Sequence, residues 1–167
     1  MKTRTIAALL LSLVSACGGS SDPKVLISEG QRAQASGNYA DAAESYEKAL
    51  AALGSDSSSP EWKRAKLGLI GARVRIDAAK AKDEFLQLAS ANPGKITDSD
   101  FNDVVSRFGD AEKFDEAIAI LKAGKEKFPE SKHLDDMGKA LQKQVQKSGN
   151  KEAAKDLEGL GYAGGDE

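Results

Sequence analysis

The stretch GNYADAAESYEKAL, residues 37–50, decides the fold that this sequence predicts. A second stretch, EKFDEAIAILKAG at residues 112–124, repeats its pattern. Each places an aromatic residue three positions before an alanine, and a large apolar residue four positions after that alanine. Residues four apart lie on one face of an α-helix, one turn from each other. The alanine and the large residue therefore share one helix face, where we expect the small alanine to allow another helix to approach and the large residue to fill the space beside it.

This pattern resembles the second helix of a tetratricopeptide repeat, whose unit is 34 residues long. A 34-residue frame set on the two stretches gives three units, at about residues 23–56, 62–95 and 98–131. The middle unit carries Ala81 and Phe85 at the small and large positions, while Leu69 and Val105 replace the glycine that the family has in the first helix. The resemblance predicts an all-α fold, an antiparallel helix-pair solenoid with about three repeats. A plain bundle of six to eight helices is the alternative.

The segment after the third unit also has helical periodicity. Apolar residues recur on one helix face between Leu134 and Val145, a break follows at residues 148–150, and a shorter helix is expected up to about residue 160. Stacked repeats need a terminal cap with a polar outer face. Residues 132–160 are therefore predicted to form a C-terminal cap, or else a degenerate fourth unit, and residues 161–167 are expected to be a disordered tail.

The amino-terminal residues have the features of an export signal. Lys2 and Arg4 are basic, and residues 6–14 are apolar except for Ser12. A membrane-spanning helix needs roughly twenty apolar residues. The segment is therefore too short to span a bilayer and is typical of a secretory signal peptide.

The next four residues, Val-Ser-Ala-Cys at positions 14–17, resemble the lipobox of bacterial lipoproteins. The resemblance implies that residues 1–16 are removed and that Cys17 receives lipid, with acyl chains such as palmitate. Cys17 is the only cysteine, so it has no partner for an intramolecular disulfide. The alternative is an ordinary signal peptide beside a chance cysteine.

Residues 17–22 are predicted to form the lipidated cysteine and a flexible linker, because they are small and polar. In well-studied lipoproteins, an aspartate directly after the cysteine favours the inner membrane. This chain has Gly18 there. The expected location is thus the periplasmic face of the outer membrane, with the inner membrane as the lesser possibility.

Charge and composition exclude some classes of protein. Removal of Lys2 and Arg4 from the 24 basic residues leaves 22 against 26 acidic ones, a net charge of −4. This balance is unlike that of nucleic-acid-binding domains, so no nucleic-acid partner is expected.

No catalytic, metal or cofactor site is predicted. His133 is the only histidine, and one histidine without a cysteine partner does not build a usual zinc site. Acidic residues at 98, 100, 135 and 136 lie near expected helix starts, where they interact favourably with the helix dipole. The alternative is that the acids near Asp98 or Asp135 serve an envelope hydrolase.

In the repeat family, the first helices line a concave groove that binds peptides or partner domains. The corresponding positions here form a polar, locally basic surface that would attract an acidic segment. Its residues are Lys24, Ile27, Gln31, Gln34, Lys63, Lys66, Ile70, Arg73, Ser99, Asn102 and Ser106. The leading hypothesis is a membrane-tethered periplasmic scaffold or adaptor that binds another envelope protein or an acidic peptide segment. A self-assembling structural component of the envelope is the rival hypothesis.

Overall fold

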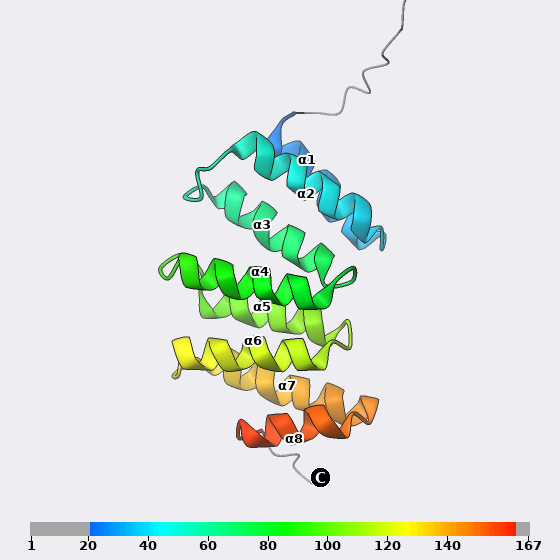
Figure 1. Ribbon diagram of the computed structural model, residues 1–167, viewed down its shortest axis with the longest axis vertical. Helices are drawn as coiled ribbons and strands as arrows, with labels where there is room; N and C mark the ends of the chain where they lie inside the picture. The colour runs from blue at the N-terminus through cyan, green and yellow to red at the C-terminus, as the bar shows by residue number, and fades with distance from the viewer. Residues whose placement is uncertain (1–20, 163–167) are drawn as a thin grey trace, which may run out of the picture.

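A computed structural model describes residues 21–162, and this part of the chain is all-helical, with no strand. The prediction of an all-α fold is confirmed. Eight helices follow one another and are joined by short turns (Figure 1). They are α1 (Pro23–Ala35), α2 (Tyr39–Leu53), α3 (Pro60–Arg73), α4 (Ala78–Ala91), α5 (Asp98–Gly109), α6 (Phe114–Lys127), α7 (Lys132–Ser148) and α8 (Lys151–Gly159).

Six of the eight helices within residues 21–162 begin where a short polar side chain accepts a hydrogen bond from one of the first backbone N–H groups. Asp22 and Ser59 cap α1 and α3, each directly before a proline whose missing N–H costs nothing in the first turn. At α5, the Thr97 side chain accepts from the backbone N–H of Asp100 while Asp100 accepts from the backbone of Thr97, which forms a capping box. These signals are local, because each capping side chain lies within three residues of the N–H group that donates to it.

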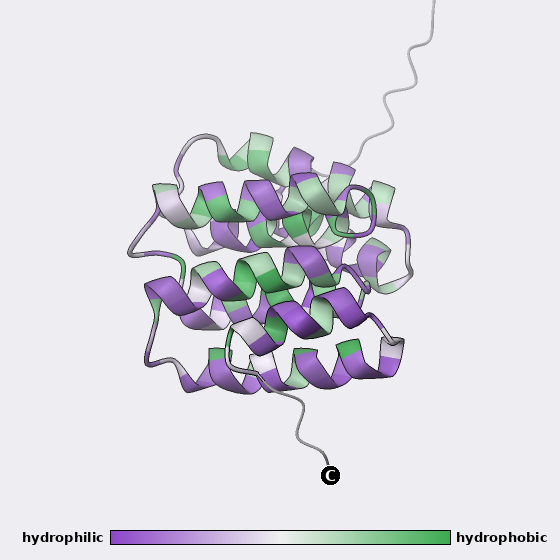
Figure 2. Ribbon diagram, turned by 60° about the horizontal axis from the view of Figure 1, so that its bottom comes forward, coloured by the Kyte–Doolittle hydropathy of each residue, from purple (hydrophilic) through white to green (hydrophobic). Residues whose placement is uncertain are grey.

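The helices pack in a two-layer stack. Helix α1 packs on α3, α3 on α5 and α5 on α7, while α4 packs on α6 and α6 on α8. The two layers are joined by extensive packing within the pairs α1–α2 and α5–α6. Figure 2 shows hydrophobic residues on the sides of the helices that face one another and hydrophilic residues toward the outside.

Two of the turns inside the helix pairs use the same backbone geometry, and a third does not. Gly37 after α1 has φ +79° and Glu112 after α5 has φ +56°, both in the left-handed region. In both turns the next residue donates its N–H to the carbonyl five positions earlier. The turn between α3 and α4 has no residue with positive φ, and it contains Val74 and Ile76, whose branched side chains disfavour that conformation. Helices α3 and α4 diverge from this turn (Figure 1) and pack less extensively than α1 and α2.

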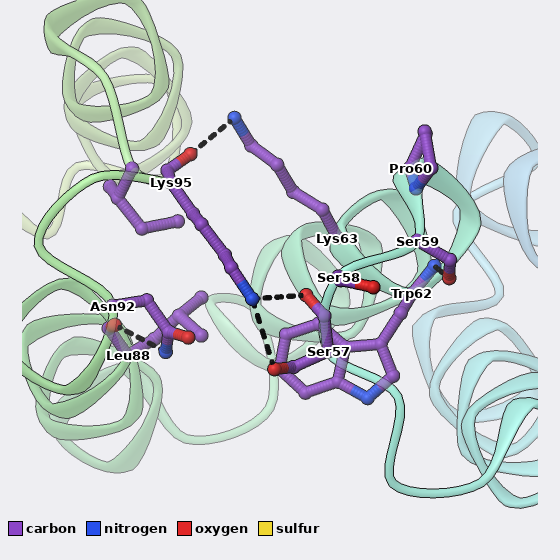
Figure 3. A pocket seen from close by; sticks show the side chains of 10 residues that line it. Ser57, Ser58, Ser59, Pro60, Trp62, Lys63, Leu88, Asn92 and Lys95 are labelled. Carbon is purple, nitrogen blue, oxygen red and sulfur yellow. Dashed lines mark hydrogen bonds between the residues drawn. The ribbon is translucent and has the colours of Figure 1, made fainter.

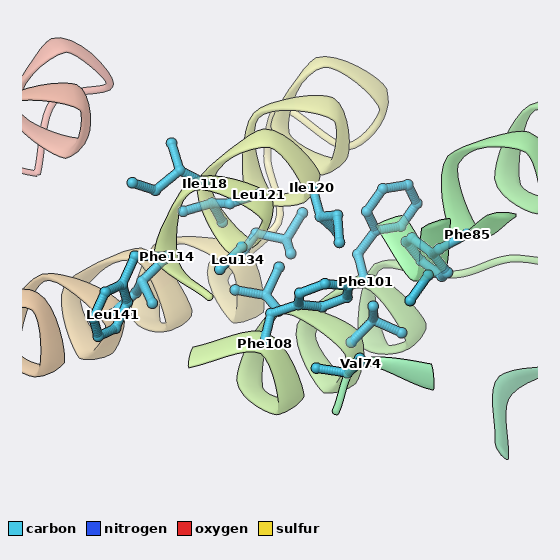
Figure 4. Close-up of a cluster of buried hydrophobic side chains, with 14 of the residues drawn as sticks. Val74, Phe85, Phe101, Phe108, Phe114, Ile118, Ile120, Leu121, Leu134 and Leu141 are labelled. Atoms are coloured by element: carbon cyan, nitrogen blue, oxygen red, sulfur yellow. The ribbon is translucent and has the colours of Figure 1, made fainter. Parts of the chain in front are cut away.

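The hydrophobic core has two parts. The smaller part joins α1, α2 and α3 around Tyr46, which is 2% exposed. The larger part joins α3 to α8 and is rich in phenylalanine (Figure 4). Within it, the rings of Phe85 and Phe101 meet edge to face with centroids 4.9 Å apart, a favourable aromatic geometry.

The carboxy-terminal pair α7–α8 continues the stack in the same manner, since α7 packs on α5 and α8 packs on α6. Tyr162, which the sequence analysis places in a disordered tail, is instead 9% exposed. Its hydroxyl donates to the carbonyl oxygen of Leu134 at 3.4 Å, and its ring lies over Gly138, where a Cβ would approach within 2.1 Å. The glycine in α7 makes room for the ring, and the residues after 162 lie outside the described part of the chain.

Candidate functional site

Helices α1, α3 and α5 form a face with a hollow of about 430 Å³. A second hollow of about 170 Å³ adjoins it and shares Gln34 and Arg107 with it. We call this surface the arginine face and define it by Gln31, Gln34, Arg64, Leu67 and Arg107, all of which line the larger hollow.

Glycines in α3 allow side chains of neighbouring helices to lie directly against α3 at the arginine face. A Cβ at Gly68 would lie 2.6 Å from the ring of Tyr46, and a Cβ at Gly71 would lie 2.2 Å from Nη1 of Arg107. The ring and the guanidinium occupy the space that side chains on α3 would otherwise fill. The Tyr46 hydroxyl donates to Oε1 of Gln34 at 3.3 Å, and burial raises the pKa of Tyr46.

The charges of this face are not neutralised within the described part of the chain. Neither Arg64 nor Arg107 forms an ion pair there. Arginine presents a planar fork of N–H donors that matches a carboxylate. The face therefore combines two arginine side chains with the amides of Gln31 and Gln34, a set suited to an acidic segment.

The structure divides the residues of the predicted groove among several environments. Gln31 and Gln34 lie together on the arginine face. Ile27 and Ile70 are 3% and 0% exposed and belong to the core. Ser99 is exposed, Asn102 and Ser106 are half-buried, and none of these three lines either hollow of the arginine face.

Three of the four predicted cations are neutralised by acids of the chain itself. Lys24 is 3.8 Å from Glu61, and Lys63 is 2.6 Å from Asp100. Arg73 is ion-paired with both Glu47 and Glu84. The fourth, Lys66, forms no ion pair among residues 21–162, and it lines a different cavity.

The sequence prediction missed Arg64 and Leu67 because of the register of α3, and it missed Arg107 on α5 because it selected Ser106, one residue earlier. Each residue of an α-helix is rotated by about 100° from the one before it. Lys63 and Lys66, which the prediction selected, therefore lie on the side of α3 toward α4, whereas Arg64 and Leu67 lie on the arginine face. The spacing of Arg64, Gly68 and Gly71 was the available signal, since glycines inside a helical pattern mark a close approach to another element.

A second cavity lies between α3 and α4, near the ends of both helices where residues 54–59 and 92–97 connect them to their neighbours. It has a volume of about 260 Å³, and Trp62 and Leu88 lie on opposite sides of it (Figure 3). It adjoins a hollow of about 250 Å³ that also contacts Trp62 and Leu88 and includes Lys66. We call the two together the Trp62 groove. Its lining residues are Ser57, Ser58, Ser59, Pro60, Trp62, Lys63, Lys66, Glu84, Gln87, Leu88, Ala91, Asn92, Lys95 and Ile96.

The carboxylates considered for hydrolysis have structural contacts. Asp98 accepts a hydrogen bond from the Ser131 hydroxyl at 2.6 Å, which lowers its pKa. Asp135 accepts from Nζ of Lys125 at 2.7 Å, which also lowers its pKa. A general acid needs a raised carboxyl pKa, so both shifts run against that role.

No group of three or more metal-ligating side chains occurs within residues 21–162. No helix in this range is long and apolar enough to cross a membrane. His133 is exposed. Cys17 and the predicted signal peptide lie outside the described residues.

Comparisons with protein-family models, with curated proteins and with solved structures each find no match to this chain.

Proposed function

We propose that this protein is a lipid-anchored adaptor of the bacterial cell envelope, built on a tetratricopeptide-like fold, which binds an acidic segment of another envelope protein through its arginine face. The lipobox-like sequence at 14–17 and the short apolar segment before it support the anchor. The linker would then hold the helical domain at the membrane surface, at the periplasmic side of the outer membrane.

The two-layer packing supports the repeat part of this proposal. The pairs α1–α2 and α5–α6 share a left-handed residue in their turns, and they place Ala42 with Tyr46 and Ala117 with Leu121 in the core. The pair α3–α4 departs from that arrangement through its different turn. The eight helices within residues 21–162 would then form four helix pairs of the solenoid, of which α7–α8 is the last.

The arginine face is the observation that carries the binding proposal. Burying an arginine against a partner without a counter-charge is costly, whereas a carboxylate that accepts from it restores the balance. Arg64 and Arg107 form no ion pair among residues 21–162 and lie beside a hollow of about 430 Å³, which favours a partner that brings acidic side chains.

Photo-crosslinking in cells tests the binding. A photoreactive amino acid replaces Leu67 in the full chain, and the same substitution at exposed Lys122 on α6 serves as the control. One dominant protein adduct from position 67, lost in Arg64→Glu and Arg107→Glu variants and absent from position 122, is expected. Equal adducts from both positions, or adducts that persist after charge reversal, would refute the arginine face as the binding site.

Metabolic labelling tests the anchor separately. Cells that express the full chain are given an alkyne analogue of palmitate, and the label is detected after purification. Incorporation that disappears in Cys17→Ser, together with release of the protein from the membrane fraction, is the expected result. Undiminished labelling in that variant, or none in the parent chain, would contradict lipid attachment at Cys17.

A further inference from the structure

The Trp62 groove is a second surface with the properties of a binding site, and it involves α3 and α4 rather than α1, α3 and α5. It exists because α3 and α4 diverge from their shared turn (Figure 1). Within residues 21–162, α4 packs on α6 but does not pack to a similar extent on α2, so α2 leaves the opening uncovered.

The floor of the groove is apolar. Trp62 is only half-buried, and it lines the groove with Leu88, Ile96 and Pro60. A cavity of about 260 Å³ remains beside these side chains in the described part of the chain. Incompletely covered apolar surface with a large aromatic residue at its centre is typical of protein interaction sites, where one apolar anchor of the partner supplies much of the affinity.

The loops hold one end of the groove open in a defined shape. Nζ of Lys95 donates to the carbonyl oxygen of Ser57 at 3.2 Å and to its hydroxyl at 3.3 Å, while Nζ of Lys63 donates to the carbonyl oxygen of Lys95 at 2.9 Å (Figure 3). These bonds tie residues 54–59 to residues 92–97. The site is thus preformed, which reduces the entropy lost on binding.

The charges around the floor favour an anionic partner. Both oxygens of Glu84 accept hydrogen bonds from Arg73, which Glu84 shares with Glu47. Lys66 lines the same hollow and has no ion pair among residues 21–162. A carboxylate of the partner is the group that would complete this arrangement.

We propose that the Trp62 groove is a docking site for a peptide segment of a partner protein, which inserts one large apolar side chain between Trp62 and Leu88 and places a neighbouring Asp or Glu beside Lys66. A peptide fits better than a compact ligand because the two hollows are joined along α3 and α4. The segment would extend from the apolar anchor point toward Lys66.

A random peptide library provides an unbiased test. Twelve-residue peptides displayed on phage are selected on the full chain, and the enriched peptides are synthesised. The expected consensus is one large apolar residue with an acidic residue within two positions of it. Trp62 is the only tryptophan of the chain, so its fluorescence reports on the groove directly, and we expect peptide binding to shift its emission to shorter wavelength.

Matched variants locate the binding. Ala91 is exposed and lines the groove, so Ala91→Phe fills it without altering the core. We expect Ala91→Phe and Lys66→Glu each to weaken peptide binding at least tenfold. Ala79→Phe and Lys80→Glu make the same changes at exposed positions on α4 outside the groove and should leave affinity unchanged.

Several outcomes would overturn the proposal. These are the absence of any enriched peptide, a consensus without the paired apolar and acidic residues, and binding that is insensitive to Ala91→Phe. Loss of binding in Arg64→Glu would assign the peptides to the arginine face instead.

Dodecanoate is the probe for a lipid-like ligand. If adding dodecanoate shifts the Trp62 emission and displaces the peptides, the groove is a site for amphiphiles and not for a peptide segment.

Discussion

The guanidinium of Arg73 on α3 donates to both carboxylate oxygens of Glu84 on α4, and it also reaches Glu47 on α2. The Arg73 and Glu84 side chains are 19% and 18% exposed, so this pair is screened less than a surface ion pair. Arg73→Met should lower the free energy of unfolding by about 2 kcal/mol, because it leaves two carboxylates without their shared donor. Urea denaturation measures this, and the double variant with Glu84→Gln should lose less than the two single losses added together.

The exposed pair of Lys48 and Glu44 is the matched control for Arg73. Both side chains are more than 60% exposed and lie four residues apart on α2. Lys48→Met should leave the urea midpoint nearly unchanged, because exposed pairs of this kind contribute little to stability. A loss as large as that of Arg73→Met would contradict the distinction drawn from burial.

The ring of Tyr46 is held between Gly30 and Gly68. Cβ atoms at these glycines would lie 2.9 Å and 2.6 Å from the ring. Gly68→Ala should therefore lower the free energy of unfolding by about 2 kcal/mol through overpacking, despite the better helix propensity of alanine. In a Tyr46→Leu background the same substitution should be tolerated, and a full additional loss there would refute the steric explanation.

Gly71 is the comparison for Gly68, because a Cβ there meets the flexible end of Arg107 instead of a buried ring. Gly71→Ala should leave stability unchanged or raise it by up to about 1 kcal/mol through helix propensity. It should also displace the Arg107 guanidinium and weaken any ligand of the arginine face. A stability loss comparable to that of Gly68→Ala would show that α3 needs close backbone contact at both positions.

Glu112 adopts a left-handed backbone conformation in the turn between α5 and α6, with φ +56°. A side chain in this region costs about 1 kcal/mol relative to glycine. Glu112→Gly should therefore stabilise the protein by about that amount, as measured by thermal or urea denaturation. Gly37→Ala, at the equivalent turn after α1, should instead lower the free energy of unfolding. If both substitutions change it in the same direction, the two turns are not equivalent.

Gln142 on α7 is 4% exposed, and its Oε1 has no hydrogen-bond partner within the described part of the chain. Burying an acceptor without a donor costs free energy that an apolar side chain of similar size avoids. Gln142→Met should match the parent or exceed its free energy of unfolding by up to about 1 kcal/mol. A clear loss of stability would indicate that Oε1 has a partner in the folded protein.

Asp135 gives the fold a dependence on acid pH. The hydrogen bond from Lys125 is the largest of the effects that hold its pKa below the ordinary value of 3.8. Since the folded-state pKa is lowered, the ionised carboxylate stabilises the fold above pH 3.8, and this contribution is lost as the pH falls through the folded-state pKa. Asp135→Asn should thus lower the urea midpoint near pH 7, and it should lower the midpoint less at about pH 2.5. An effect that is the same at both pH values would assign it to packing instead.

The break between the last two helices was predictable because its signal is local. The predicted break at residues 148–150 separates α7 from α8. The spacing of Ala42 with Tyr46 and of Ala117 with Leu121 correctly predicted helix faces that pack closely, and all four residues are buried. Tyr162 could not be foreseen, because its burial depends on the space that Gly138 leaves on a different helix.

The candidate sites were predictable only in part. Gln31 and Gln34 line one hollow of the arginine face, while Lys63 and Arg73 form ion pairs within the chain. The 34-residue frame assigned the groove positions of α3 by resemblance alone, with no independent indication of which face of α3 is exposed. A shift of one residue turns a helical side chain by about 100°, which is enough to move it to another face.

The sequence by itself determined the helical class, the break between α7 and α8 and the residues of the closest helix contacts, because these depend on periodicity and on groups within a few residues of one another. Only the tertiary structure decided which cations are neutralised, where Arg64 and Arg107 come together, and that α3 and α4 diverge to expose Trp62. Ion pairs such as Arg73 with Glu84 join residues on separate helices. Their formation depends on the rotation and inclination of each helix, which are set by packing across the whole stack.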